Sequence, residues 1–138
     1  MPSFRSVASG LVLAAMMGGC AQHQAHVQLR GTSWQLDMMG EQRAMPPRPM
    51  LTFDGAGNVA GQASCNRYSV PVTIAGSAIT FGPIAATRMA CGEAIDAQES
   101  AYFARLGSAT RFELDASILR IYSGDDPAPL LFLRTPAP

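Results

Sequence analysis

Histidine is missing from most of this chain, because both histidines, His23 and His26, lie within the first 26 residues. The remainder therefore has no imidazole that could act as a general base. The chain also contains no Gly-x-Ser-x-Gly sequence, no Walker sequence and no glycine-rich dinucleotide fingerprint. The carboxylates left as candidates for acid–base chemistry are Asp37, Asp54, Glu93 and Glu113. No two of them form a motif, so we predict a protein that is not an enzyme, with no catalytic residue and no cofactor.

Lysine is absent as well, and the ten arginines are balanced by ten acidic residues, so the formal net charge is zero. The arginines are scattered among the acids along the chain. A nucleic-acid-binding protein is expected to show a net basic face instead. The composition therefore predicts that nucleic acid is not a partner.

An apolar segment precedes the first cysteine. Arg5 supplies one positive charge, residues 7–17 are mostly apolar, and Met17-Gly18-Gly19-Cys20 ends the segment. The run is too short to span a bilayer as a helix, which takes about 20 apolar residues. Its layout is typical of a bacterial lipoprotein signal. We predict that residues 1–19 are a signal peptide and that Cys20 is lipidated; an ordinary secretory signal cleaved nearby is the alternative.

Residues 20–28 would then be the lipidated cysteine and a short polar tether. Several acyl chains on Cys20, palmitate among them, would anchor the protein stably to a membrane. Ala21, rather than Asp, follows the cysteine, which by resemblance to other lipoproteins favours the periplasmic face of the outer membrane. His23 and His26 lie in this tether with no acidic residue beside them, so we predict a linker and no metal site.

The pattern over residues 29–135 predicts one small domain of short strands. Trp34-Gln35-Leu36-Asp37-Met38 alternates apolar and polar residues, as a half-buried strand does. The proline-rich stretch 41–49 is a predicted loop, Asp54-Gly55-Ala56-Gly57 is a predicted turn, and Pro71 indicates an edge strand. The predicted strands are residues 34–38, 50–53, 58–63, 68–74, 78–81, 110–114, 118–122 and 130–134.

Residues 93–106 are the one predicted helix. Its apolar face, expected in the core, contains Ile95, Tyr102, Phe103 and Leu106. Its remaining surface, expected in solvent, contains Asp96, Glu99 and Arg105. One helix among many strands predicts a sheet-rich α+β domain, with the strands curling around or beside the helix.

Two cysteines remain after Cys20, namely Cys65 and Cys91. In an oxidising compartment a disulfide between them is the economical interpretation. It would close a loop of about 26 residues and stabilise the fold by about 3.5 kcal/mol on the chain-entropy account. A redox-active thiol is the alternative, although neither a Cys-x-x-Cys spacing nor an adjacent histidine supports it.

Two blocks of the sequence are specific, namely Cys65-Asn66-Arg67-Tyr68 and Thr87-Arg88-Met89-Ala90-Cys91. They stand between Leu29-x-Gly-Thr-x-Trp34 and Leu130-x-Phe132-x-Arg134. In this order the blocks resemble the META domain of HslJ-like bacterial lipoproteins. The resemblance covers about residues 29–135. It implies a small curled antiparallel sheet or open barrel with one main helix, and it implies no enzymatic reaction.

If Cys65 and Cys91 are bridged, Asn66 and Arg67 approach Thr87 and Arg88. One hypothesis is a binding site for a carboxylate, a lipid headgroup or a peptide C-terminus, because planar guanidinium groups suit such ligands. The alternative is structural: Asn66 and Thr87 would satisfy turn backbones, while the two arginines would pair with acids or carbonyl groups.

Two functional hypotheses remain. The first is a monomeric, outer-membrane-anchored periplasmic lipoprotein that acts as an interaction or stress-tolerance module and binds another envelope protein. The second is a carrier for a lipid or other small apolar ligand, or an assembly factor similar to secretin pilots. Methionines that suit an adaptable apolar pocket, or simple core filling, are Met38, Met39, Met50 and Met89.

Overall fold

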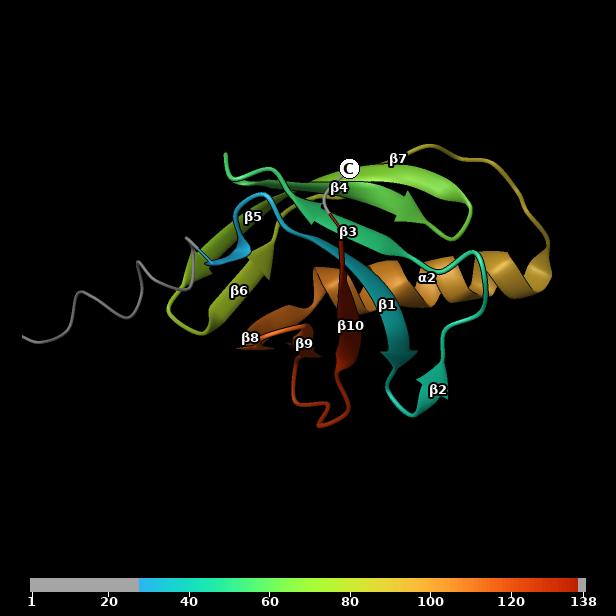
Figure 1. Ribbon diagram of the computed structural model, residues 1–138. Helices are drawn as coiled ribbons and strands as arrows, with labels where there is room; N and C mark the ends of the chain where they lie inside the picture. The colour runs from blue at the N-terminus through green and yellow to red at the C-terminus, as the bar shows by residue number, and fades with distance from the viewer. Residues whose placement is uncertain (1–27, 137–138) are drawn as a thin grey trace, which may run out of the picture.

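The computed structural model describes residues 28–136 (Figure 1). The predicted signal peptide, Cys20 and most of the tether with His23 and His26 lie outside these residues. Within residues 28–136, no helix has both the length and the apolar character that a membrane crossing requires.

Eight antiparallel strands form a closed barrel. They are β1 (Ser33–Met39), β3 (Met50–Phe53), β4 (Asn58–Ala63), β5 (Asn66–Ala75), β6 (Ala78–Phe81), β8 (Ala109–Asp115), β9 (Ile118–Ser123) and β10 (Leu130–Thr135). Their order is β10-β9-β8-β6-β5-β4-β3-β1, and β1 pairs again with β10. The open barrel expected from the resemblance is therefore corrected to a closed one.

Closure depends on β1, which pairs with β3 along one side and with β10 along the other. Its register against β10 runs from Ser33 opposite Thr135 to Met39 opposite Leu130, with an irregularity between Leu36 and Met38. A bulge of this kind bends and twists a strand, as the curvature of a barrel requires. The pairing joins the two ends of the domain and leaves no local signature in the sequence.

Two further strands contain only two residues each. β2 (Gln42–Arg43) pairs with the end of β1, and β7 (Ala85–Ala86) pairs with β5. β2 lies within the stretch 41–49 that was predicted to be a loop, and β7 was not predicted. Two residues are too few to show an alternating pattern, so both strands depend on the neighbour that they pair with.

Pro71 does not mark an edge strand, because β5 lies between β4 on one side and β6 and β7 on the other. On the β4 side, the Val72 amide donates a hydrogen bond to the Gly57 carbonyl at 2.9 Å. On the opposite side, the Pro71 carbonyl accepts a hydrogen bond from the Gly82 amide, also at 2.9 Å. Pro71 thus stands between the residues that pair with β7 and those that pair with β6. A missing N–H is tolerated where the partner strand is interrupted.

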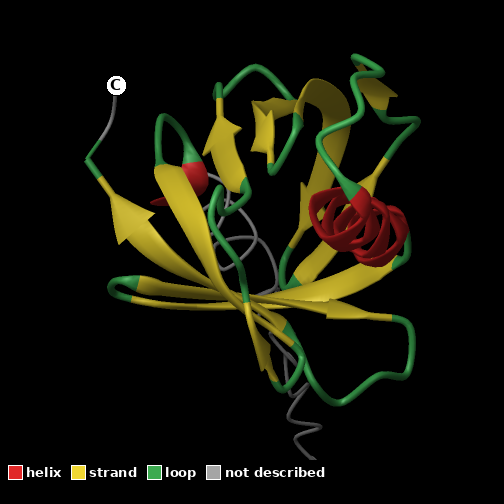
Figure 2. Cartoon of the chain, turned by 90° about the vertical axis from the view of Figure 1, so that its right-hand side faces the viewer, coloured by secondary structure: helices red, strands yellow, loops and turns green. Residues whose placement is uncertain are grey.

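The helix α2 (Glu93–Gly107) agrees with the predicted helix to within one residue and lies against the barrel (Figure 2). Tyr102 and Leu106 are fully buried and belong to the hydrophobic core. Glu99 is also buried, with 7% of its surface exposed, although the sequence placed it on the solvent face. Its position three residues before Tyr102 and seven before Leu106 puts it on the same face of the helix.

The interior of the barrel is filled with side chains. Members of one core cluster include Trp34, Leu36, Leu51, Phe53, Val59, Tyr68, Val70, Ile79, Phe112, Leu119, Ile121, Leu130 and Phe132. They come from all of the long strands, and the helix adds Tyr102 and Leu106. An eight-stranded barrel has an interior just wide enough for side chains or one small ligand, and here side chains occupy it.

We expect Gly61→Ala to unfold the domain or destabilise it by about 3 kcal/mol or more. A β-carbon at Gly61 would lie 2.0 Å from the Met50 carbonyl oxygen, so two paired strands would have to separate. Gly107→Ala is the matched control, since no atom other than those of its chain neighbours and its own helix backbone lies within 4 Å of the β-carbon position there. Urea unfolding of both variants would measure the difference, and equal stabilities would contradict this account of the β3–β4–β5 packing.

Candidate functional site

A disulfide joins the β4–β5 turn to the loop formed by residues 87–92, which connects β7 to α2. The structure contains the bridge between Cys65 and Cys91 that the sequence predicts, with their Cα atoms 5.8 Å apart. Cys65 is buried and Cys91 is exposed. The Asp96 carboxylate accepts the Cys91 amide at 3.0 Å, which fixes the far end of the loop to the first turn of the helix.

Asn66, the first residue of β5, binds the same loop with its side-chain amide. Its Oδ1 accepts the Met89 amide at 2.7 Å and the Thr87 hydroxyl at 2.9 Å, and its Nδ2 donates to the Met89 carbonyl at 3.1 Å. Every polar atom of this side chain is therefore used inside the protein. The structural hypothesis for Asn66 and Thr87 agrees with this geometry.

Glu99 holds Asn66 in turn. One carboxylate oxygen accepts the backbone amides of Cys65 and Asn66 at 2.8 and 2.7 Å, and the other accepts the Asn66 Nδ2 at 2.5 Å. We call Asn66, Glu99, Thr87 and the backbone of Met89 the Asn66–Glu99 cluster. A buried carboxylate needs such donors, because an unpaired charge in the interior is very unfavourable. The cluster thus links the helix, β5 and the loop in one network.

The neighbouring helix residue Gln98 extends this network to the loop after β2. Its Oε1 accepts the Met45 amide at 2.7 Å, and its Nε2 donates to the Met45 carbonyl at 2.9 Å and to the Ser64 hydroxyl at 2.8 Å. One turn further along, the Tyr102 and Tyr68 hydroxyls lie 2.7 Å apart. Burial raises the pKa of both phenols, so both remain protonated hydrogen-bond donors.

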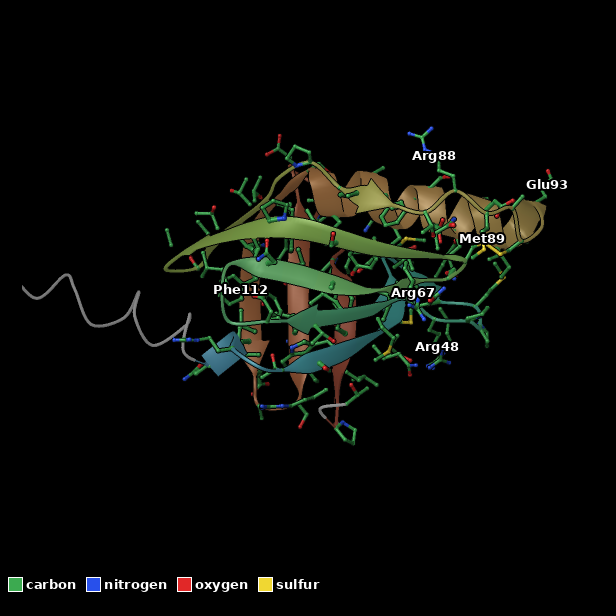
Figure 3. All side chains as sticks on the ribbon, turned by 90° about the horizontal axis from the view of Figure 1, so that it is seen from above. Arg48, Arg67, Arg88, Met89, Glu93 and Phe112 are labelled. Atoms are coloured by element: carbon green, nitrogen blue, oxygen red, sulfur yellow. A yellow bond between two sulfur atoms is a disulfide. The ribbon has the colours of Figure 1, made fainter. Side chains whose placement is uncertain are left out.

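Arg67 and Arg88 are both exposed, and neither guanidinium forms a hydrogen bond or an ion pair with any residue in the range 28–136. Their segments do meet, since the Thr87 amide donates to the Arg67 carbonyl at 3.0 Å. The side chains do not converge, because Arg88 extends from the loop into solvent, away from Arg67 (Figure 3). The structure therefore brings Asn66 and Thr87 together and leaves the two arginines apart.

The remaining candidate carboxylates have other roles. Asp37 pairs with Arg43 at 3.0 Å and with Arg48 at 3.4 Å. Asp54 closes the β3–β4 turn, and the amides of Ala56 and Asn58 hold the pKa of its carboxyl below its ordinary value.

Glu113 lies on the outside of β8, where Arg111 and the Tyr122 hydroxyl lower the pKa of its carboxyl. The Asp96 carboxylate lies close to both cysteine sulfurs, and the three ligand atoms are within 4.8 Å of one another. Sulfurs joined in a disulfide are not thiolate ligands, so this group does not form a metal site in the oxidised protein.

A groove of about 460 Å³ lies outside the barrel, between α2 and the segment around β2. Its walls are mostly apolar and include Met39, Met45, Ala94, Ala97 and Ala101. Met45 is 43% exposed, and Met89 on the 87–92 loop is 59% exposed. The exposed apolar side chains at this end of the molecule therefore come from segments that Gln98 and Asn66 hold in place.

We expect Glu99→Gln to destabilise the domain by about 2–3 kcal/mol, because the new amide group would face the Asn66 Nδ2 donor and one charged acceptor would be lost. Glu93→Gln is the matched control, since Glu93 is exposed at the start of the same helix and its loss should change stability by less than about 1 kcal/mol. Chemical denaturation would compare the two variants. Equal losses would mean that the buried carboxylate does not hold the cluster.

A family model described as the META domain matches residues 27–137 of this chain. The chain is similar in fold to a protein from Burkholderia xenovorans solved by NMR, with 21% identity, a TM-score of 0.66, and 94% of this chain and 99% of that chain covered. A second NMR structure matches at 20% identity and a TM-score of 0.65, covering 78% of this chain and 92% of that one. No curated protein matches. Since the family model spans nearly the whole described domain, the chain belongs to the META domain family.

Proposed function

We propose that this protein is a periplasmic lipoprotein, anchored in the outer membrane through Cys20, whose META domain binds another envelope protein without catalysing a reaction. The observation that carries the proposal is the contrast within the 87–92 loop. Its backbone is held by Asn66 and the disulfide, whereas the side chains of Arg88 and Met89 extend outward without a partner in residues 28–136.

A loop held in one conformation loses little conformational entropy on binding, so its exposed side chains can contribute more fully to affinity. Arginine and methionine are both enriched in the centres of protein interfaces. An exposed methionine beside an unpaired arginine therefore suits contact with a protein surface better than contact with solvent. The interaction module is favoured over the carrier, because a carrier would need space for an apolar ligand inside a barrel that the core side chains fill.

The arrangement of the domain also suits an anchored protein. The first described residues and the 87–92 loop lie at opposite ends of the domain in Figure 1. A lipid on Cys20, only a short tether away from Gln28, would hold the first end near the membrane. The loop would then face the periplasm, where a partner could reach it. A role in stress tolerance or in assembling other envelope proteins is compatible with the same surface.

The membrane-extracted protein should have the mass of a chain that begins at an acylated Cys20 and should gain two hydrogens on reduction. Intact-mass spectrometry before and after reduction and alkylation would measure both features. An unlipidated chain with two free thiols would remove the anchor and the disulfide from the proposal and would reopen the redox alternative for Cys65 and Cys91.

A photo-crosslinking amino acid at Met89 should give one defined adduct with an envelope protein in living cells, because that side chain lies on the proposed contact surface. The matched control is Leu133, a large apolar side chain on β10 that is also exposed, by 41%. Gel shift and mass spectrometry of both samples would show the adduct. Equal labelling from the two positions, or none from Met89, would contradict binding through the 87–92 loop.

A further inference from the structure

The outer edge of β7 and the backbone of Arg88, two residues after its end, present free backbone groups. Tyr68 pairs with Ala86, while the Thr87 amide donates to the Arg67 carbonyl. Backbone groups of successive residues in a strand point to alternate sides. Those of Ala86 therefore point away from β5, and no other strand within residues 28–136 pairs with β7. Within the same residues, the amide and carbonyl of Arg88 form no hydrogen bond, although both neighbours, Thr87 and Met89, are bonded to β5 residues.

The peptide bond between Arg88 and Met89 is held on both sides by one side chain. On the amino-terminal side, the Thr87 hydroxyl donates to the Asn66 Oδ1. On the carboxyl-terminal side, both the amide and the carbonyl of Met89 bind the Asn66 side chain, at 2.7 and 3.1 Å. The disulfide at Cys91 fixes the chain two residues further on. If this bond were cut, both new ends would stay in place.

A serine endopeptidase binds its target as an added strand and places the side chain before the cleaved bond in a specificity pocket, which is acidic in enzymes that cleave after arginine. Ala86 and Arg88 offer the backbone groups for such a strand, and the Arg88 guanidinium, unpaired within the described residues, offers the positive charge. We propose that the 87–92 loop inhibits a serine endopeptidase that cleaves after arginine. This inference rests on the proposed function, because it specifies which kind of protein the loop binds.

The hydrogen bonds of Asn66 and the disulfide determine what happens to the Arg88–Met89 bond when an endopeptidase attacks it. The serine oxygen of the endopeptidase attacks the Arg88 carbonyl carbon, the bond to the Met89 nitrogen breaks, and that nitrogen takes the proton from the histidine of the enzyme. In an ordinary substrate the new amine diffuses away, and water completes hydrolysis. Here Asn66 and the disulfide keep the Met89 amine beside the acyl group. The amine attacks the ester carbon and gives its proton to the histidine, the peptide bond reforms, and the histidine returns the proton to the departing serine oxygen.

Arg67 provides the matched control. It is exposed and has no ion-pair partner in the described range, as is true of Arg88. It differs because its amide and carbonyl both bind Thr87 across the strand pair. Its backbone is therefore not free to join a strand of an endopeptidase, so of these two arginines it is Arg88 that combines free backbone groups with an exposed guanidinium.

The test uses trypsin as the probe and the full-length, oxidised chain purified in detergent. Hydrolysis of a small arginine amide would report inhibition, and mass spectrometry would locate any cleavage in the chain. We expect the chain to inhibit trypsin, with the Arg88–Met89 bond cut much more slowly than in the reduced, unfolded chain. Arg88→Gln should weaken inhibition by about 100-fold or more, while Arg67→Gln should change it by less than about 3-fold.

Three results would overturn the inference: no inhibition by the folded chain, equal inhibition by the Arg88→Gln variant, or cleavage at Arg88–Met89 as fast as in the unfolded chain. Failure of this inference is distinguishable from failure of the proposed function. A specific crosslink from Met89 to a protein that is not an endopeptidase, together with uninhibited trypsin, would leave the interaction module in place and remove only the inhibitory role.

Discussion

The buried carboxylate of Glu99 is the interaction on which the rest of the site depends. Its two oxygens accept three N–H groups, all from Cys65 and Asn66 at the β4–β5 turn. A buried charge without these donors would be very unfavourable. The helix and the turn are therefore held in one position relative to each other. Glu99 thereby orients the side-chain amide of Asn66, and this amide orients the 87–92 loop. The conformation of the surface proposed to bind a partner therefore depends on hydrogen bonds inside the domain.

Closure of the barrel means that the proposed contact surface lies on its outside. Once β1 pairs with both β3 and β10, the ring of long strands within residues 28–136 is complete, and the inward-facing side chains fill the interior. A free backbone edge remains at β7, which contains two residues. A strand that short adds little to the stability of the sheet. We explain β7 by its position before the 87–92 loop. Thr87 continues the pairing of β7 with β5, so the strand holds the start of the loop in place.

Local patterns in the sequence predicted the elements well and their long-range partners poorly. The strand over residues 58–63 and the helix from Glu93 were confirmed, because alternation, turn glycines and helical spacing are local signals. The pairing of β1 with β10 connects the ends of the domain, so no local signal exists for it. Glu99 was wrongly assigned to solvent because a carboxylate is rarely buried, although its spacing from Tyr102 and Leu106 places it on the inner face.

For the candidate site, the sequence identified the two cysteines, Asn66, Thr87 and the two arginines. It left open whether these residues bind a ligand or stabilise the fold. In the structure, some of these residues stabilise the fold, and a residue beside them is exposed to solvent. Asn66 and Thr87 form internal hydrogen bonds, and Arg88, next to Thr87, points outward. The side chain of Met89 is also exposed, while its backbone amide and carbonyl bind Asn66, so one residue can both fix the loop and present a side chain to solvent. Under the proposed function, the internal hydrogen bonds would favour recognition by the exposed side chains, because an arginine on a mobile loop would lose more conformational entropy on binding.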